Sequence, residues 1–103
     1  MSLKKLSKKL TIKNPLGIHL VPATKIATIA KNAENKVWLI KNNVQVDASK
    51  VLDILALICE QHTEISIKIE HYSDSKILYK LIELIENGFG ELDVPSKGDT
   101  KRN

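Results

Sequence analysis

The segment NPLGIHLVPATKIA, residues 14–27, places a histidine where a helix is expected to begin. His19 follows a turn that contains Gly17, and Pro22 lies three positions later, in the first turn of the expected helix. Proline is tolerated there because the first N–H groups of a helix have no partner within the helix. His19 is therefore either a simple loop or capping residue or a group placed to hold an anion at the positive end of a helix dipole.

The other residues with metal-binding or nucleophilic side chains are poorly spaced for chemistry. His62 and His71 show no ligand spacing with His19 or with the single cysteine, Cys59, so we expect no metal site and no cofactor. Cys59 lies in the apolar run VLDILALICE, which predicts a buried thiol, and one cysteine excludes a disulfide within the chain. No general acid or base accompanies His19 in the sequence, so we do not expect an enzyme with its own turnover.

Composition and charge favour one small domain that does not bind nucleic acid. The chain has 103 residues, of which 43% are hydrophobic, enough for a single core. The net charge is +4, but residues 12–91 hold nine lysines and ten acidic residues, a sum of −1. The excess positive charge therefore lies at the two ends. Without a basic face, and with four aromatic residues in all, nucleic-acid binding is not expected.

The two ends of the chain are expected to be disordered. Residues 1–7 form a basic segment, in part a cloning remnant, residues 8–91 the folded domain, and residues 92–103 a polar tail with little to bury. The start MSLKKLSKKL lacks the apolar core of a signal peptide, and no apolar run approaches the ~20 residues of a membrane span. We therefore expect a cytoplasmic protein with no membrane insertion, and nothing demands more than a monomer.

Periodic segments predict the element order β-α-β-β-α-β-α. Strands are expected where apolar and polar residues alternate, at residues 8–14, 36–40, 44–46 and 64–70. Helices are expected at residues 20–32, 49–61 and 73–88. Asn42 and Asn43 suit a tight turn between the middle strands, Ser73 is the expected cap of the last helix, and Gly88 its stop. These short elements indicate an α+β fold, with helices on one face of an antiparallel sheet.

The helix expected at residues 49–61 is apolar over a wider arc than a core-facing stripe needs. Val51, Leu52 and Leu55 belong to that arc. The surplus has two interpretations, a helix that is buried on more than one side or an exposed docking patch.

The motif NPLGIHLVPA, the element order and the closing LIELIENGFGE resemble those of the histidine-containing phosphocarrier (HPr) family of the bacterial phosphotransferase system. The resemblance spans about residues 8–91. It implies an open-faced β-sandwich, in which three helices cover one face of a four-stranded antiparallel sheet. It also implies a role in sugar transport, because such proteins accept a phosphoryl group from enzyme I, which is charged by phosphoenolpyruvate, and pass it to a IIA component.

By this resemblance, His19 is the phosphorylated residue, and the chemistry of a helix start agrees with that role. The backbone N–H groups of Leu20 and Val21 would meet the phosphoryl oxygens. The dipole favours the neutral, nucleophilic ring, so His19 would form a covalent intermediate. Gly17 would form the turn and Pro22 the helix start. Partner docking is expected at the apolar residues Leu20, Val21, Val51, Leu52 and Leu55.

Three departures from the family pattern bear on this function. The arginine usual two residues after the histidine, which can pair with phosphate oxygens, is replaced by Val21. The regulatory serine of some members falls on Lys50, and Ser49, one position earlier, is expected to be a helix cap rather than a kinase site. Glycines usual near the end of the second helix are replaced by Ile58 and His62.

Two functions remain open from the sequence. The first is a phosphocarrier that uses His19. The second is an HPr-like regulatory or interaction module, with weak or no phosphotransfer because Val21 replaces the arginine.

Overall fold

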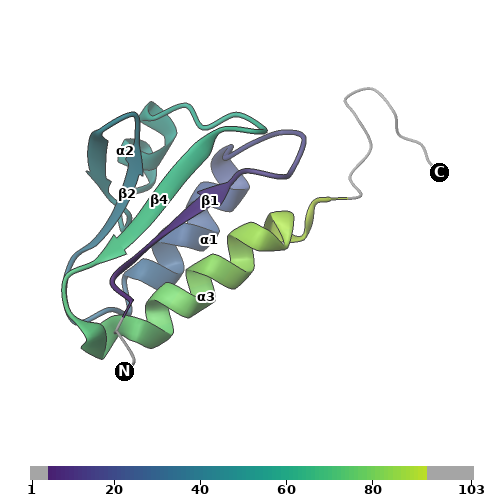
Figure 1. Ribbon diagram of the computed structural model, residues 1–103. Coiled ribbons are helices and arrows are strands. Elements are labelled where there is room, and N and C mark those ends of the chain that lie inside the picture. The colour runs from purple at the N-terminus through teal and green to yellow at the C-terminus, as the bar shows by residue number, and fades with distance from the viewer. Residues whose placement is uncertain (1–4, 93–103) are drawn as a thin grey trace.

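Four strands form one antiparallel sheet in the order β1-β4-β2-β3 (Figure 1). They are β1 (Ser7–Thr11), β2 (Val37–Lys41), β3 (Val44–Asp47) and β4 (Glu64–Ile69). The computed structural model describes residues 5–92. Most of the segment expected at residues 1–7, and of the tail expected at residues 92–103, therefore lies outside the described residues.

Three helices cover one face of this sheet (Figure 1). They are α1 (Leu20–Ala30), α2 (Val51–Ala56) and α3 (Ser75–Glu86), with short 3₁₀ turns η1 (Tyr72–Asp74) and η2 (Gly88–Gly90) before and after α3. The predicted element order and the open-faced β-sandwich are both confirmed.

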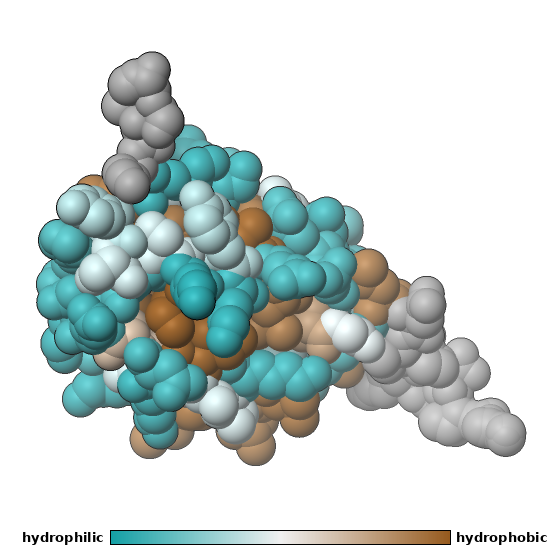
Figure 2. All heavy atoms as spheres, turned by 90° about the horizontal axis from the view of Figure 1, so that it is seen from below, coloured by the Kyte–Doolittle hydropathy of each residue, from teal (hydrophilic) through white to brown (hydrophobic). Residues whose placement is uncertain are grey.

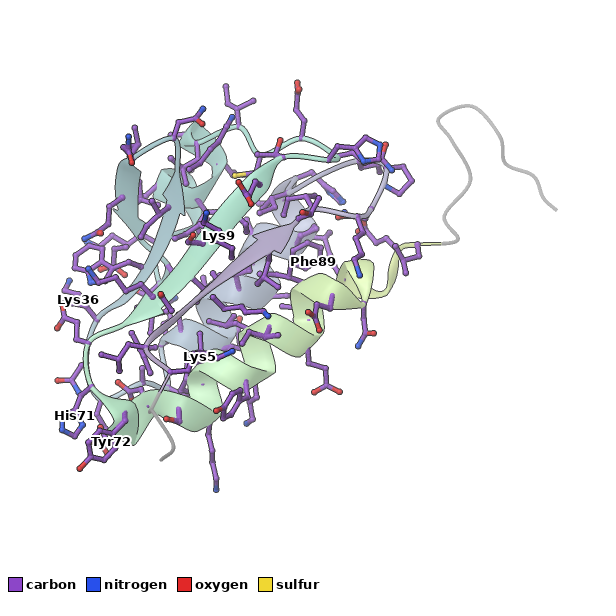
Figure 3. The ribbon with its side chains drawn as sticks, viewed as in Figure 1. Lys5, Lys9, Lys36, His71, Tyr72 and Phe89 are labelled. Atoms are coloured by element: carbon purple, nitrogen blue, oxygen red, sulfur yellow. The ribbon has the colours of Figure 1, made fainter. Side chains whose placement is uncertain are left out.

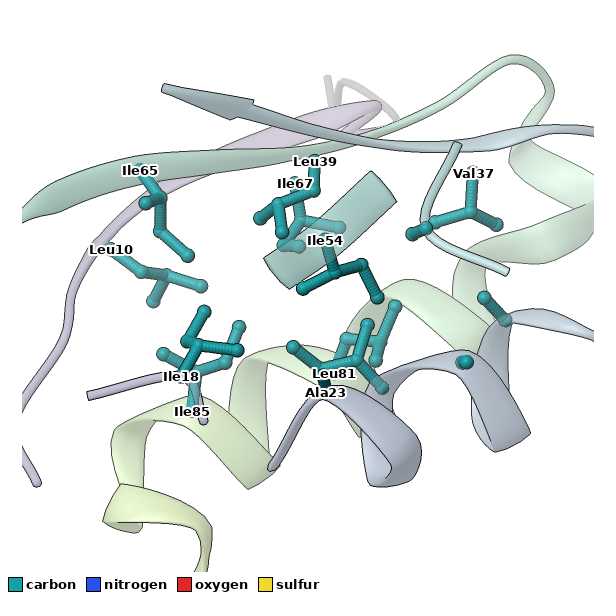
Figure 4. Packing of buried hydrophobic residues seen from close by; sticks show 14 of the residues in the cluster. Leu10, Ile18, Ala23, Val37, Leu39, Ile54, Ile65, Ile67, Leu81 and Ile85 are labelled. Carbon is teal, nitrogen blue, oxygen red and sulfur yellow. The ribbon is translucent and has the colours of Figure 1, made fainter. Parts of the chain in front are cut away.

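The core lies between the sheet and the helices, as the alternating pattern predicted. Ile65, Ile67 and Ile69 of β4 are buried, whereas Lys68 between them is exposed. Residues that lie opposite one another in the ladder share a face, so Ile67 pairs with Leu39 on the buried side. The helices supply the other half of the core (Figure 4), chiefly Ile26, Ile54, Leu78, Leu81 and Ile85. Each such side chain contributes roughly 1.5–3 kcal/mol through its burial.

The turn between β2 and β3 confirms the prediction made from its two asparagines. Asn42 and Asn43 have φ values of 51° and 67°. A two-residue hairpin turn with positive φ at both positions matches the twist of the strands, and asparagine tolerates that conformation better than most residues.

The second helix is shorter than predicted at both ends. It spans Val51–Ala56, and its N-cap position is Lys50 with no side-chain cap. The prediction that Ser49 caps this helix is wrong. Asp47 precedes it and accepts hydrogen bonds from both the backbone N–H and the hydroxyl of Ser49, at 2.9 and 2.7 Å, so the hydroxyl is engaged before the helix begins.

The same helix ends early because the chain turns into the left-handed region at Ile58 (φ 55°). The ammonium group of Lys41, at the end of β2, donates to the carbonyl oxygens of Leu57 and Ile58. These carbonyls are therefore satisfied by a cation rather than by a further helical turn. His62, the second position where glycine was expected, also has a positive φ, of 72°.

The third helix also begins later than predicted, at Ser75, and the prediction that Ser73 caps it is wrong. The N–H of Ser73 instead donates to Nδ1 of His71, 3.0 Å away, within the 3₁₀ turn. The buried carboxylate of Asp74 accepts from the backbone N–H groups of Glu34 and Asn35, which ties the start of α3 to the loop before β2. At the other end Gly88, with φ 62°, ends the helix as predicted.

Candidate functional site

His19 occupies the N-cap position of α1, with an extended backbone (φ −90°, ψ −164°). Its carbonyl accepts the N–H of Ala23 at 3.0 Å, the first hydrogen bond of the helix. Within residues 5–92, the N–H groups of Leu20 and Val21 donate to no acceptor. The helix start thus leaves two donors free beside a histidine whose side chain is 35% exposed.

The turn before His19 is fixed by one glycine. Gly17 has φ 67°, and a Cβ at that position would collide with the carbonyl oxygen of Cys59. The next N–H, that of Ile18, donates to the same carbonyl at 2.8 Å. The turn that holds His19 is therefore bonded to the segment that follows α2, and a side chain at Gly17 would push the two apart.

The imidazole of His19 is bonded to a carboxylate that lies 72 residues further along the chain. Nε2 is 2.8 Å from Oε2 and 3.0 Å from Oε1 of Glu91. A carboxylate can only accept, so this contact needs a proton on Nε2. In the neutral ring, Nδ1 then has the free lone pair.

A buried amide completes this arrangement. The Nδ2 group of Asn14 donates to Oε1 of Glu91 at 3.0 Å and to the carbonyl of Gly17 at 2.8 Å. Asn14 is fully buried, and Glu91 is 14% exposed. The amide therefore links the carboxylate to the same turn that positions His19.

The segment after α3 directs Glu91 back toward α1. Gly88, Phe89 and Gly90 all have positive φ values, between 58° and 78°. Phe89 is buried at the end of α3 (Figure 3), and its carbonyl accepts the ammonium group of Lys25 from α1 at 2.9 Å. This tight turn brings Glu91 against the start of α1.

Asn14 and Glu91 were missed from the sequence. The signal for Glu91 was the pair of glycines in ENGFGE, which predicts a sharp turn after the last helix but not its destination. The signal for Asn14 was the Asn-Pro pair, which favours a turn. Neither pattern indicates that Glu91 bonds both His19 and Asn14, because these contacts are formed by the tertiary fold.

The structure divides the predicted docking residues into two groups. Leu20 and Val21 on α1 and Leu52 on α2 are exposed, Leu52 by 78%. Val51 and Leu55 are half-buried and pack against the core. The apolar second helix is thus buried on one side and exposed on another, and docking at the exposed side stays a prediction.

An exposed apolar residue that was not among the predicted docking residues follows α2. Ile58, just after α2, is 63% exposed. It follows the helix that presents Leu52, and it stands where glycine was expected.

The start of α2 presents a lysine rather than a hydroxyl. Lys50 is exposed at the N-cap, and Ser49 is half-buried and bonded to Asp47. Burial would raise the pKa of Asp47, but hydrogen bonds from Lys36 and Ser49 lower it to about 2. Ser49 thus belongs to a buried polar cluster, and its role as a regulatory site stays untested.

His71 and Cys59, the other candidate reactive groups with distinctive surroundings, make no side-chain hydrogen bond to His19. His71 stacks on Tyr72 with ring centroids 4.4 Å apart, at the opposite end of α3 from Phe89 (Figure 3). Cys59 is buried, as predicted, and burial raises the pKa of its thiol.

Among residues 5–92, no three side chains of His, Cys, Asp or Glu are grouped to hold a metal ion. None of the described helices is long and apolar enough to cross a membrane.

A shallow groove lies beside the site, between α1 and α3. Its volume is about 460 Å³, and its apolar lining comes from Ile29, Leu84 and Phe89. Figure 2, seen from the side on which α3 lies, shows apolar side chains between hydrophilic ones on this face. No histidine or cysteine lines the groove. The candidate site is therefore the exposed start of α1 rather than an enclosed pocket.

Comparisons with known proteins agree with this geometry. The family model described as PTS HPr component phosphorylation site matches residues 6–87. A phosphocarrier protein HPr of Chlamydia trachomatis is 36% identical over 87 residues, which are 84% of this chain and 80% of the relative. A phosphocarrier protein NPr of Proteus mirabilis is 31% identical over 85 residues, which are 82% and 94% of the two chains. The crystal structure of HPr-C-His from Thermoanaerobacter tengcongensis superposes with a TM-score of 0.77 at 28% identity, covering 82% of this chain and 96% of that one.

Proposed function

Because the chain belongs to the HPr family of phosphotransferase-system phosphocarrier proteins, we propose that it accepts a phosphoryl group from enzyme I on His19 and passes it to a IIA component. The observation that supports this assignment is the half-exposed imidazole of His19 beside two free N–H groups at the start of α1. We also propose that the protein acts as a monomer in the cytoplasm, in a chain that serves sugar transport.

The proposed transfer uses Nδ1 of His19 as the nucleophile, since Nε2 is bonded to Glu91. The Nδ1 lone pair forms the N–P bond while the bond between phosphorus and the donor breaks, and that bond's electron pair leaves with the donor. The N–H groups of Leu20 and Val21 can then donate to the phosphoryl oxygens at the positive end of the dipole. Transfer to the acceptor reverses these steps, and the electron pair returns to Nδ1.

The proposed docking surface consists of Leu20, Val21 and Leu52, with Val51 and Leu55 supporting it from beneath. Exposed apolar side chains beside a reactive group suit a partner that must bring its own reactive group close and exclude water.

A second candidate is an interaction module that modulates a partner without phosphotransfer. Val21 favours it, because this position offers no charge to pair with phosphoryl oxygens. Within residues 5–92, the charged side chain bonded to His19 is the carboxylate of Glu91, which is no partner for a phosphoryl anion.

One experiment separates the two functions. The protein is incubated with enzyme I and phosphoenolpyruvate, and its intact mass is measured at alkaline pH, because phosphohistidine is labile in acid. The phosphocarrier gains the mass of one phosphoryl group, and His19→Ala abolishes the gain. His62→Ala is the matched control and keeps it, since His62 lies away from any helix start. No gain in the unmodified protein would favour the interaction module.

A further inference from the structure

We infer that Glu91, oriented by Asn14, compensates the positive charge that the imidazole of His19 gains when Nδ1 is phosphorylated. In this chain the carboxylate of Glu91 lies beside Nε2 and would balance the positive charge of the ring. The arginine usual in the family would instead balance the negative charge of the phosphoryl oxygens. This inference rests on the proposed function and deepens it.

The geometry places the carboxylate on the side of the ring that does not react. Both oxygens of Glu91 lie within 3.0 Å of Nε2 of His19. The side chain of Glu91 is 14% exposed, so water screens this contact only in part. A short hydrogen bond between an imidazole N–H and a carboxylate strengthens when the ring becomes charged.

The charge changes during transfer show what the carboxylate does. In the neutral ring, Nε2 carries the proton and Nδ1 the lone pair. When Nδ1 bonds to phosphorus, the ring becomes an imidazolium that keeps its Nε2 proton, and this proton faces the carboxyl oxygens of Glu91. When the N–P bond breaks, its electron pair returns to Nδ1 and a neutral imidazole leaves. Without a proton on Nε2, the leaving group would be an imidazole anion, which leaves far less readily.

Asn14 fixes the direction of the carboxylate. Its amide donates one hydrogen bond to Oε1 of Glu91 and one to the carbonyl of Gly17. The N–H of His19 donates to the same Gly17 carbonyl at 3.1 Å. The carbonyl of Gly17 therefore accepts from both the backbone of His19 and the side chain of Asn14, which orients Glu91. Asn14 is a positioning residue that acts through Glu91, because no hydrogen bond joins it to the imidazole.

The first test needs no partner protein. Long-range ¹H–¹⁵N correlation spectra of the unmodified protein, recorded where the ring is neutral, distinguish protonation at Nε2 from protonation at Nδ1. We expect the Nε2–H form for His19, and a mixture of the two forms in Glu91→Ala and in Asn14→Ala. A predominant Nδ1–H form in the unmodified protein would overturn the inference and the choice of Nδ1 as nucleophile, whereas phosphorylation of His19 is judged separately by the mass measurement.

The second test measures phosphotransfer. Glu91→Gln keeps a hydrogen-bond acceptor but removes the charge, and we expect phosphorylation by enzyme I to slow by about tenfold or more. Glu86→Gln, at the exposed end of α3, is the matched control and should leave the rate unchanged. An equal rate for Glu91→Gln and the unmodified protein would overturn the inference alone. If the unmodified protein accepts no phosphoryl group, the proposed function fails and the inference falls with it.

Discussion

The ammonium group of Lys41 on β2 lies 3.0 Å from the carbonyl oxygen of Leu57, the C-cap residue of α2. A cation at a helix C-terminus opposes the negative end of the dipole and satisfies carbonyls that the helix leaves free. This contact holds the chain where Ile58 enters the left-handed region. It explains how α2 can end without the glycine that the family usually has there.

Replacing Ile58 by glycine should stabilise the protein. A β-branched residue at φ 55° is strained by about 1–2 kcal/mol, and this side chain is mostly exposed, so little burial is lost. Glycine increases the entropy of the unfolded chain, which offsets part of the gain. We expect Ile58→Gly to raise the free energy of unfolding by about 0.5–1 kcal/mol in urea titrations. Ile58→Val keeps the strain and serves as the control, and a loss of stability in Ile58→Gly would show that the Ile58 side chain makes contacts that outweigh the strain.

Val21→Arg should accelerate phosphorylation by enzyme I. Val21 is exposed in the first turn of α1, so an arginine fits without displacing the core. Its guanidinium group could pair with the phosphoryl oxygens, and one charge-assisted hydrogen bond corresponds to about tenfold or more in rate. The rate should also fall more steeply with salt, since ions screen a surface charge. Stopped-flow or quench measurements over a salt series provide the check, and an unchanged rate would indicate a partner matched to valine.

Leu52→Asp should weaken binding of enzyme I without unfolding the protein. The side chain is 78% exposed, so the substitution removes almost no buried area. In the proposed interface it would place a carboxylate in an apolar contact, which costs more than 1 kcal/mol when the charge loses its water. Calorimetric titration should show at least a tenfold weaker affinity. Tyr79→Asp, exposed on α3, is the control, and equal affinity for both variants would exclude α2 from the interface.

Asp47 should make stability depend on pH below about 4. Hydrogen bonds from Lys36 and Ser49 lower its pKa from the usual 3.8 to about 2, although burial acts in the opposite direction. A carboxyl group with a lowered pKa stabilises the fold above its unfolded-state pKa, and this contribution disappears as the pH falls from about 4 to about 2. Because Lys36 is largely exposed, we expect the loss to be about 1–2 kcal/mol. Asp47→Asn should flatten this part of the curve of unfolding free energy against pH, and an unaltered slope would assign the dependence to other carboxylates.

The fold was predictable wherever local pattern and tertiary structure agree. Ile65, Ile67 and Ile69 alternate along a strand whose one face is buried, and the asparagine turn after β2 has its own backbone preference. The C-terminal end of α2 could not be predicted, because it depends on Lys41, which belongs to another element. Ser49 was misassigned for a similar reason, since its hydroxyl bonds backward to Asp47.

The part of the candidate site that is formed by consecutive residues, from the turn to the start of α1, was predictable. The turn at Gly17 and the helix start after it place His19 through local geometry alone. Glu91 reaches the imidazole of His19 and the amide of Asn14 only when α3 has packed beside α1, and no periodicity in the sequence predicts these contacts.

The distance along the chain between His19 and Glu91 sets an order of events during synthesis. The histidine emerges from the ribosome 72 residues before the carboxylate that bonds it, and β1 must likewise await β4 before it can pair. Non-local pairs of this kind form late in folding, because the loop between them must close first. A nascent chain, or one cleaved before residue 91, lacks this carboxylate, so the Nε2 atom of its imidazole is not bonded to Glu91. The hydrogen bond between His19 and Glu91 therefore forms only in the complete, folded domain.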